Sequence, residues 1–231
     1  MSLPKIDTPT YRAKLNSGFI KFRPYTVKEE KQMLMASESG DQKIIFETIL
    51  SLCQACVVDD IDIQDLPMFD LERLLIAMRS KSVGEEIKTS IVCKECGSQT
   101  DYSINIENIE TEQSDGIKET IMLNDTYGLK LRLPSIKNTG METIIQDIDI
   151  VNIIMACIES VFDKETVYPF DENTEEEKRE FVEALSVEHL KEITDNFFTK
   201  IPINIVDIKF KCPKCNHTIE RKVNNILDFF I

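Results

Sequence analysis

The sequence contains no tryptophan, two histidines, and only seven glycines and eight prolines among 231 residues. So little glycine and proline excludes collagen-like and low-complexity chains and is typical of an ordinary globular protein. Apolar runs are short, and none approaches the roughly 18 residues of a membrane-spanning helix. Residues 1–7 lack the apolar core of a secretory signal peptide. We therefore expect no membrane span and a reducing environment for the cysteines.

Common motifs of catalysis are also missing. The sequence contains no GxxxxGK[ST] phosphate loop, no GxGxxG fingerprint and no GxSxG nucleophile elbow. The histidines, His189 and His217, are not part of an HExxH pattern. Carboxylates are so numerous that close pairs arise without catalytic meaning. We therefore expect that the protein is not an enzyme.

Positive charge is in the minority, with 27 Lys and Arg against 41 Asp and Glu and a formal net charge of −14. Such a surface repels phosphate backbones, which makes nucleic acid an unexpected partner. With 42% hydrophobic residues, the chain is long enough to bury a core in one or two domains.

Two Cys-x-x-Cys pairs are the most informative feature that is present, and each lies between two strand-like segments. Cysteines at this spacing in a turn can direct both sulfurs at one tetrahedral ion, and four thiolates are a common ligand set of structural zinc. The residue after each pair is Gly97 or Asn216, the types that best tolerate positive φ. We predict one structural Zn²⁺ bound by Cys93, Cys96, Cys212 and Cys215.

Other roles for these cysteines are less compatible with the pattern. A disulfide within each pair would close a strained small ring, and a thioredoxin-like site would place the pair at the start of a helix. Strands are expected after both pairs instead. Iron–sulfur binding, redox chemistry and the absence of a metal remain alternatives, as does His217 in place of one sulfur.

Basic residues gather near the two pairs: Lys88, Lys94, Lys209, Lys211, Lys214, Arg221 and Lys222. A zinc ion with four thiolates carries a net charge of −2, which nearby ammonium groups would offset. The same residues permit an alternative function, a zinc-ribbon nucleic-acid-binding regulatory protein, or the docking of an acidic partner protein.

A third pair, Cys53 and Cys56, has the same spacing but a different context. It lies in the segment 44–58, where apolar residues recur at three- and four-residue intervals. Cysteines one turn apart on a helix pack as small hydrophobic residues. We predict that this pair, and Cys157 in another apolar helix, belong to the core.

The remaining segments alternate between short strands and helices. We expect hairpins at 11–23 and 120–133, strands at 102–106, 204–210 and 218–223, an acidic link at 107–115, an extended piece at 162–169, and helices at 27–38, 42–58, 68–81, 141–160, 175–185 and 187–198. Ser/Thr-x-x-Glu capping boxes at Thr26, Thr139 and Thr174 begin three of the helices.

These elements predict an α+β fold with two mainly helical lobes joined by a small zinc-ribbon-like β module. The N-terminal hairpin and three-helix lobe spans 1–86, the composite ribbon 87–106 plus 203–224, and the inserted lobe 107–202. An apolar tail, 225–231, ends in Phe229, Phe230 and Ile231. These three side chains either fold back onto the body or insert into a partner.

A family resemblance rests on several sequence segments: Leu3–Tyr11, Phe22–Glu30, Leu66–Arg73, Arg79–Glu85, the two cysteine pairs and Asp228–Phe230. Together they resemble the baseplate protein family of T-even-like contractile-tailed bacteriophages, whose members are hub subunits or hub assembly proteins. The resemblance covers nearly the whole chain.

The resemblance implies a late phage protein that acts in the host cytoplasm during tail assembly. It would bind other baseplate hub proteins, either as a lasting subunit of the virion tail baseplate or as an assembly factor that departs. It implies no catalytic residues, and both cysteine pairs are retained in this sequence.

Overall fold

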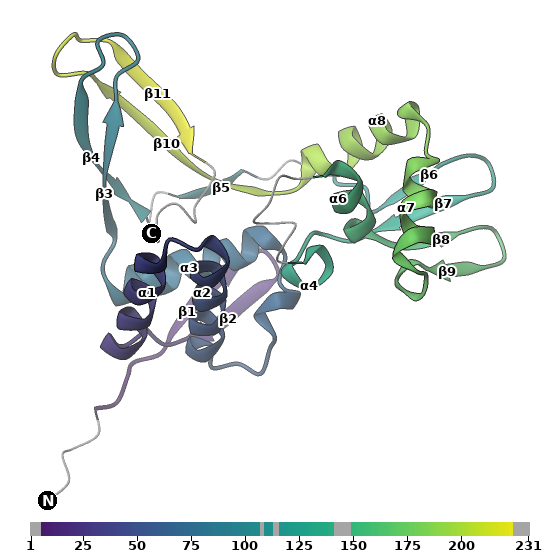
Figure 1. The fold of residues 1–231 in the computed structure, drawn as a ribbon, viewed down its shortest axis with the longest axis horizontal. Coiled ribbons are helices and arrows are strands. Elements are labelled where there is room, and N and C mark those ends of the chain that lie inside the picture. The colour runs from purple at the N-terminus through teal and green to yellow at the C-terminus, as the bar shows by residue number, and fades with distance from the viewer. Residues whose placement is uncertain (1–5, 107–108, 113–115, 141–148, 224–231) are drawn as a thin grey trace, which may run out of the picture. The chain divides into compact units, whose positions relative to one another are not determined.

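The computed structural model describes residues 6–106, 109–112, 116–140 and 149–223. The fold is α+β, as predicted, and the chain divides into two compact units (Figure 1). Unit 1 comprises 1–63, 69–112 and 203–231, and unit 2 comprises 64–68 and 113–202. Within the described ranges, no helix is both long and apolar enough to cross a membrane.

Unit 1 opens with a hairpin and three helices: β1 (Tyr11–Leu15), β2 (Gly18–Phe22), α1 (Val27–Ser39), α2 (Gln42–Cys56) and α3 (Met68–Ser82). All of these elements are confirmed. Thr26 and Glu29 form the predicted capping box of α1, while the Asp41 side chain caps α2 by accepting hydrogen bonds from the N–H groups of Lys43 and Ile44.

Cys53 and Cys56 lie fully buried on α2, which confirms their predicted place in the core. Burial raises the pKa of Cys53 above its ordinary value and that of Cys56 to about 11. In unit 2, burial likewise raises the pKa of Cys157 to about 12. All three residues therefore remain neutral thiols near pH 7 and pack as small apolar side chains.

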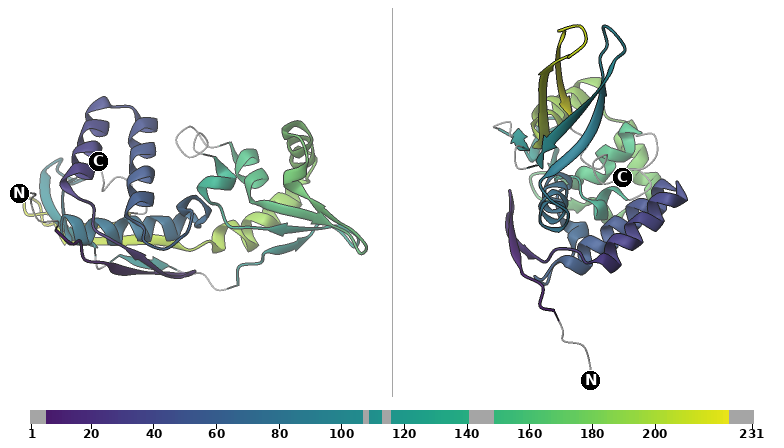
Figure 2. Two further views of the ribbon diagram at one scale, coloured as in Figure 1. Left: turned by 90° about the horizontal axis from the view of Figure 1, so that it is seen from below. Right: turned by 90° about the vertical axis from the view of Figure 1, so that its left-hand side faces the viewer.

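Unit 1 also contains two β-hairpins that belong to separate sheets. One pairs β3 (Glu86–Val92) with β4 (Gln99–Asn105); the other pairs β10 (Ile203–Lys211) with β11 (Thr218–Val223). In Figures 1 and 2 they run side by side with their turns at the same end. Their inward side chains, including Ile91, Ile104, Ile208 and Ile219, form one apolar cluster with Ile76 of α3.

The acidic link predicted at 107–115 contains a strand, so that part of the prediction is wrong. β5 (Glu110–Glu112) pairs antiparallel with the start of β10. Beside it, the buried Asn204 amide donates to the Phe69 carbonyl at 2.7 Å and to Glu72 at 3.0 Å, and its oxygen accepts from the Thr111 hydroxyl. These hydrogen bonds join α3, β5 and β10. Burial of the Glu72 carboxyl disfavours its charged form and raises its pKa.

Unit 2 contains a four-stranded antiparallel sheet in the order β6 (Thr120–Met122), β7 (Gly128–Leu131), β8 (Ile158–Phe162) and β9 (Val167–Pro169). The α-helices among its described residues are α4 (Ile136–Thr139), α6 (Ile150–Cys157), α7 (Glu175–Glu183) and α8 (Val187–Asn196). In Figure 2, α6, α7 and α8 lie on one side of this sheet. Leu129, Ile158, Ile193 and Phe197 are fully buried between them.

Two details of the predicted helix 141–160 are wrong. The helix ends at Cys157, because Ile158–Phe162 forms β8 and pairs with both β7 and β9. Thr139 does not begin it but lies at the end of α4, which Ser135 caps. Residues 141–148 lie outside the described residues, as does the predicted apolar tail, 225–231.

Candidate metal centre

The turns of the two unit 1 hairpins bring four cysteines together. One ligand atom from each of Cys93, Cys96, Cys212 and Cys215 lies within 4.8 Å of all the others. Cys93 Sγ is 3.7 Å from Cys215 Sγ, and Cys96 Sγ is 3.7 Å from Cys212 Sγ. Both short distances join residues of different hairpins, 122 and 116 positions apart in the sequence. The predicted convergence of the four cysteines is therefore confirmed.

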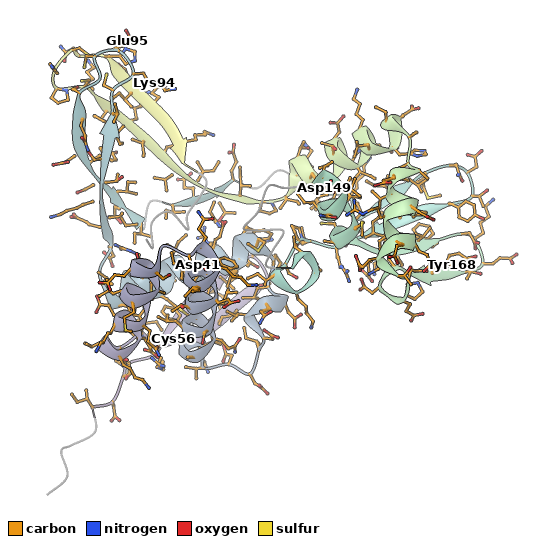
Figure 3. All side chains as sticks on the ribbon, viewed as in Figure 1. Asp41, Cys56, Lys94, Glu95, Asp149 and Tyr168 are labelled. Atoms are coloured by element: carbon orange, nitrogen blue, oxygen red, sulfur yellow. The ribbon has the colours of Figure 1, made fainter. Side chains whose placement is uncertain are left out.

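We call the turns 93–98 and 212–217 the first and the second knuckle. In the first knuckle, backbone hydrogen bonds position the two sulfurs. The Cys93 N–H donates to the Ser98 carbonyl at 2.9 Å, and the Gly97 N–H donates to the Cys93 carbonyl at 2.9 Å. Gly97 has the expected positive φ of 68°. Figure 3 shows Lys94 and Glu95, the residues between the paired cysteines, at the tip of this hairpin.

The second knuckle repeats this pattern. The Cys212 N–H donates to the His217 carbonyl at 2.8 Å, and the Asn216 N–H donates to the Cys212 carbonyl at 2.9 Å. Asn216 has a φ of 61° and is the non-glycine residue with positive φ among those described. Because asparagine tolerates this conformation, the two turns form the same backbone hydrogen bonds although their sequences differ.

The distances agree with tetrahedral coordination. Four sulfurs at about 2.3 Å from one Zn²⁺ would stand about 3.8 Å apart, close to the observed 3.7 Å. A disulfide would need an S–S distance of about 2.05 Å. All seven cysteines lie among the described residues, and each is free. The donor set fits a structural Zn²⁺, and tetrahedral thiolate sites also accept iron.

Burial of the four side chains is uneven. Cys93 and Cys212 are buried as part of the apolar cluster, Cys96 is half-buried, and Cys215 is exposed. The apolar cluster thus supports the site from one side, while one ligand borders solvent. An ion in this position would have ligands from both hairpins and would be reachable by an aqueous chelator.

Ser98 is a polar neighbour of the sulfurs that the sequence analysis missed. Its Oγ lies 3.0 Å from Cys96 Sγ and 3.3 Å from Cys212 Sγ. The hydroxyl is the largest influence that lowers the pKa of Cys212, to about 6, and it also lowers that of Cys96. The residue follows the cysteine pair directly, but spacing does not reveal where its hydroxyl points.

Other residues predicted near the centre have different roles. Among the described residues, the group of candidate ligand atoms does not include the His217 ring. Lys209 forms an ion pair with Glu220, and Lys222 forms one with Glu112. These two lysines are therefore engaged by carboxylates. The side chain of Arg221, and the whole of Phe229, Phe230 and Ile231, lie outside the described residues.

His189, the remaining histidine, is part of a helix start in unit 2. Its backbone N–H and its ring complete a capping box with Ser186, and Nε2 lies 2.8 Å from the Leu123 carbonyl. Both ring nitrogens are therefore engaged in structural contacts.

Comparisons with known proteins agree with the sequence resemblance. A family model described as "T4 bacteriophage base plate protein" matches residues 8–231. The chain is 22% identical over 221 residues to the baseplate hub assembly protein gp26 of Enterobacteria phage T4. That alignment covers 95% of this chain and 96% of the relative. No solved structure matches the chain.

Proposed function

The chain belongs to the T4 bacteriophage base plate protein family, and from this premise we propose that it assembles the baseplate hub by binding other hub proteins. The observation that carries the proposal is the near full-length alignment with a baseplate hub assembly protein. The protein performs no catalytic step in this account. It acts in the host cytoplasm and remains in the virion tail baseplate or leaves it when assembly is complete.

Affinity capture from infected cells tests this function. Tagged chain should copurify with other hub proteins, and quantitative mass spectrometry of purified particles separates a lasting subunit from a departing factor. Recovery of the tagged chain without any tail protein, under conditions that capture a known hub subunit with its partners, would contradict the proposal.

The apolar C-terminal tail is part of the same proposal. We assign Phe229, Phe230 and Ile231 to a contact with a hub partner, because three consecutive large apolar side chains favour burial. Replacing all three with serine should weaken capture of hub proteins while leaving the metal content unchanged. Unaltered capture of hub proteins would show that the tail is not part of the interface.

We also propose that the four cysteines hold one structural Zn²⁺. The support is their sulfur spacing, the matched knuckle turns and the free state of all four thiols. In the bound state Zn²⁺ supplies a cross-link between the hairpins, and no reaction takes place on it. On this account the segments 87–106 and 203–224 form one zinc-ribbon-like module.

Metal analysis of the purified chain tests this assignment. One equivalent of zinc, lost on treatment with a strong chelator together with a fall in melting temperature, is the expected result. If the chain contained iron instead of zinc, the assignment of a four-cysteine metal site would stand and only the identity of the metal would change. A chain that contains no metal and melts identically with and without chelator would contradict the assignment.

A further inference from the structure

One side chain outside the four candidate ligands touches two of their sulfurs. The Ser98 hydroxyl lies 3.0 Å from Cys96 Sγ and 3.3 Å from Cys212 Sγ. These sulfurs are 3.7 Å apart and come from different knuckles. Ser98 therefore lies over an edge of the sulfur cluster at which the two hairpins meet.

The second knuckle provides an internal comparison. His217 occupies the position equivalent to Ser98, because the carbonyl of each accepts the N–H of the first cysteine in its knuckle. The His217 side chain is exposed, and among the described residues its ring is not one of the atoms grouped with the sulfurs. The backbones of the two knuckles match, while the hydroxyl contact belongs to the first knuckle.

On the basis of the proposed zinc site, we propose that Ser98 is a positioning residue, which holds the metal-binding sulfurs in place. The single proton of its hydroxyl is shared in a bifurcated hydrogen bond between the thiolates of Cys96 and Cys212 and so holds the two knuckles at the spacing that the ion requires. The residue does not bind the ion itself.

The physical reason is the charge of the loaded site. Four thiolates around a divalent ion leave a net charge of −2, and Cys96 and Cys212 face each other across 3.7 Å. A hydroxyl that points its proton at this edge stabilises the charge, and hydrogen bonds to ionised acceptors are about twice as strong as neutral ones. Losing a partner outside the ligand set typically weakens metal binding by about 10- to 100-fold.

The test uses the full-length chain and four variants. Ser98→Ala removes the hydroxyl and keeps the backbone carbonyl that the Cys93 N–H needs. Ser98→Thr and Ser98→Val form a shape-matched pair that differs in the hydroxyl group. His217→Ala is the control at the equivalent position of the other knuckle. Zinc affinity is measured by competition with a chromophoric chelator, and the absorption spectrum is recorded with Co²⁺ in place of zinc.

We expect Ser98→Ala and Ser98→Val to bind zinc at least about 10-fold more weakly than the wild type, with Ser98→Thr close to the wild type. His217→Ala should bind normally. In the Co²⁺ form, loss of the hydroxyl should move the sulfur-to-cobalt charge-transfer band to lower energy, because a thiolate without a hydrogen bond gives up an electron more easily. A change of packing alone would not produce this shift.

The possible failures are distinguishable. Equal zinc affinity and an unchanged band in Ser98→Ala and the wild type would overturn the role of Ser98 and leave the zinc site intact. If packing weakens both members of the matched pair, equal affinity of Ser98→Thr and Ser98→Val would also overturn it. A wild-type chain that binds neither zinc nor Co²⁺ would overturn the metal site and this inference together.

Discussion

Replacing one cysteine of the second knuckle should lower the free energy of unfolding, because the proposed zinc cross-link between two remote segments is lost. Cys212→Ser removes a buried ligand whose sulfur lies 3.7 Å from that of Cys96, 116 positions earlier. If the ion constrains the unfolded chain as a disulfide would, closing a loop of this length contributes about 4–5 kcal/mol. This is an upper estimate, because unfolded cysteines also bind zinc.

Chemical unfolding followed by circular dichroism measures this effect, since the sequence has no tryptophan for fluorescence. In the presence of zinc, Cys212→Ser should unfold with a free energy lower by up to about 4–5 kcal/mol and should no longer respond to chelator. Cys53→Ala is the matched control: it should retain zinc and lose only about 1–2 kcal/mol from core packing. Equal free energies for Cys212→Ser and the zinc-loaded wild type would refute the reasoning.

Three further predictions concern the packing and charges of the two units. Arg23 donates two hydrogen bonds to Glu29 and lowers the pKa of the Glu29 carboxyl from 4.5 to about 2. The stabilisation that this pair gives the fold is complete above pH 4.5 and is lost as the pH falls toward 2. In an acid titration, Glu29→Gln should therefore lose less stability over that window than the wild type. Gly128→Ala should destabilise the fold by about 1–3 kcal/mol in thermal unfolding, because the new Cβ would clash with the Phe162 ring and Met122 Sδ. Asp70→Ala should cost about 2–4 kcal/mol, since the buried carboxylate accepts hydrogen bonds from two N–H groups of the β1–β2 turn.

Each of these has its own control. Unchanged acid sensitivity in Glu29→Gln would show that another group governs the low-pH transition. The cost of Gly128→Ala should shrink in a Phe162→Leu background, and strict additivity of the two substitutions would exclude their contact as the cause. Asp70→Asn keeps the side-chain shape but loses the charge, so it should lie between the wild type and Asp70→Ala.

The sequence predicts the elements whose signals are local. Capping boxes at Thr26 and Thr174 mark helix starts, and the two cysteine pairs followed by Gly97 and Asn216 mark turns of the observed kind. The meeting of the two pairs follows from chemistry instead of local pattern, because four thiolates separated in sequence have a common ligand in one ion.

The missed elements depend on contacts between distant residues. The segment 158–162 continues an apolar helical pattern, but pairing with β7 and β9 makes it a strand. β5 is short and acidic, and it exists through pairing with β10, more than ninety positions later in the chain. Ser98 was missed for a different reason: its position two residues after Cys96 does not reveal that its hydroxyl points at the sulfurs of Cys96 and Cys212.

The zinc content of the intact chain tests the central claim most directly. Native mass spectrometry of wild type, Cys212→Ser and Cys53→Ala should find one zinc ion in the wild type and in Cys53→Ala, and none held stably in Cys212→Ser. Metal-free wild-type protein after zinc is supplied, or undiminished zinc in Cys212→Ser, would contradict the assignment of the four cysteines to one ion.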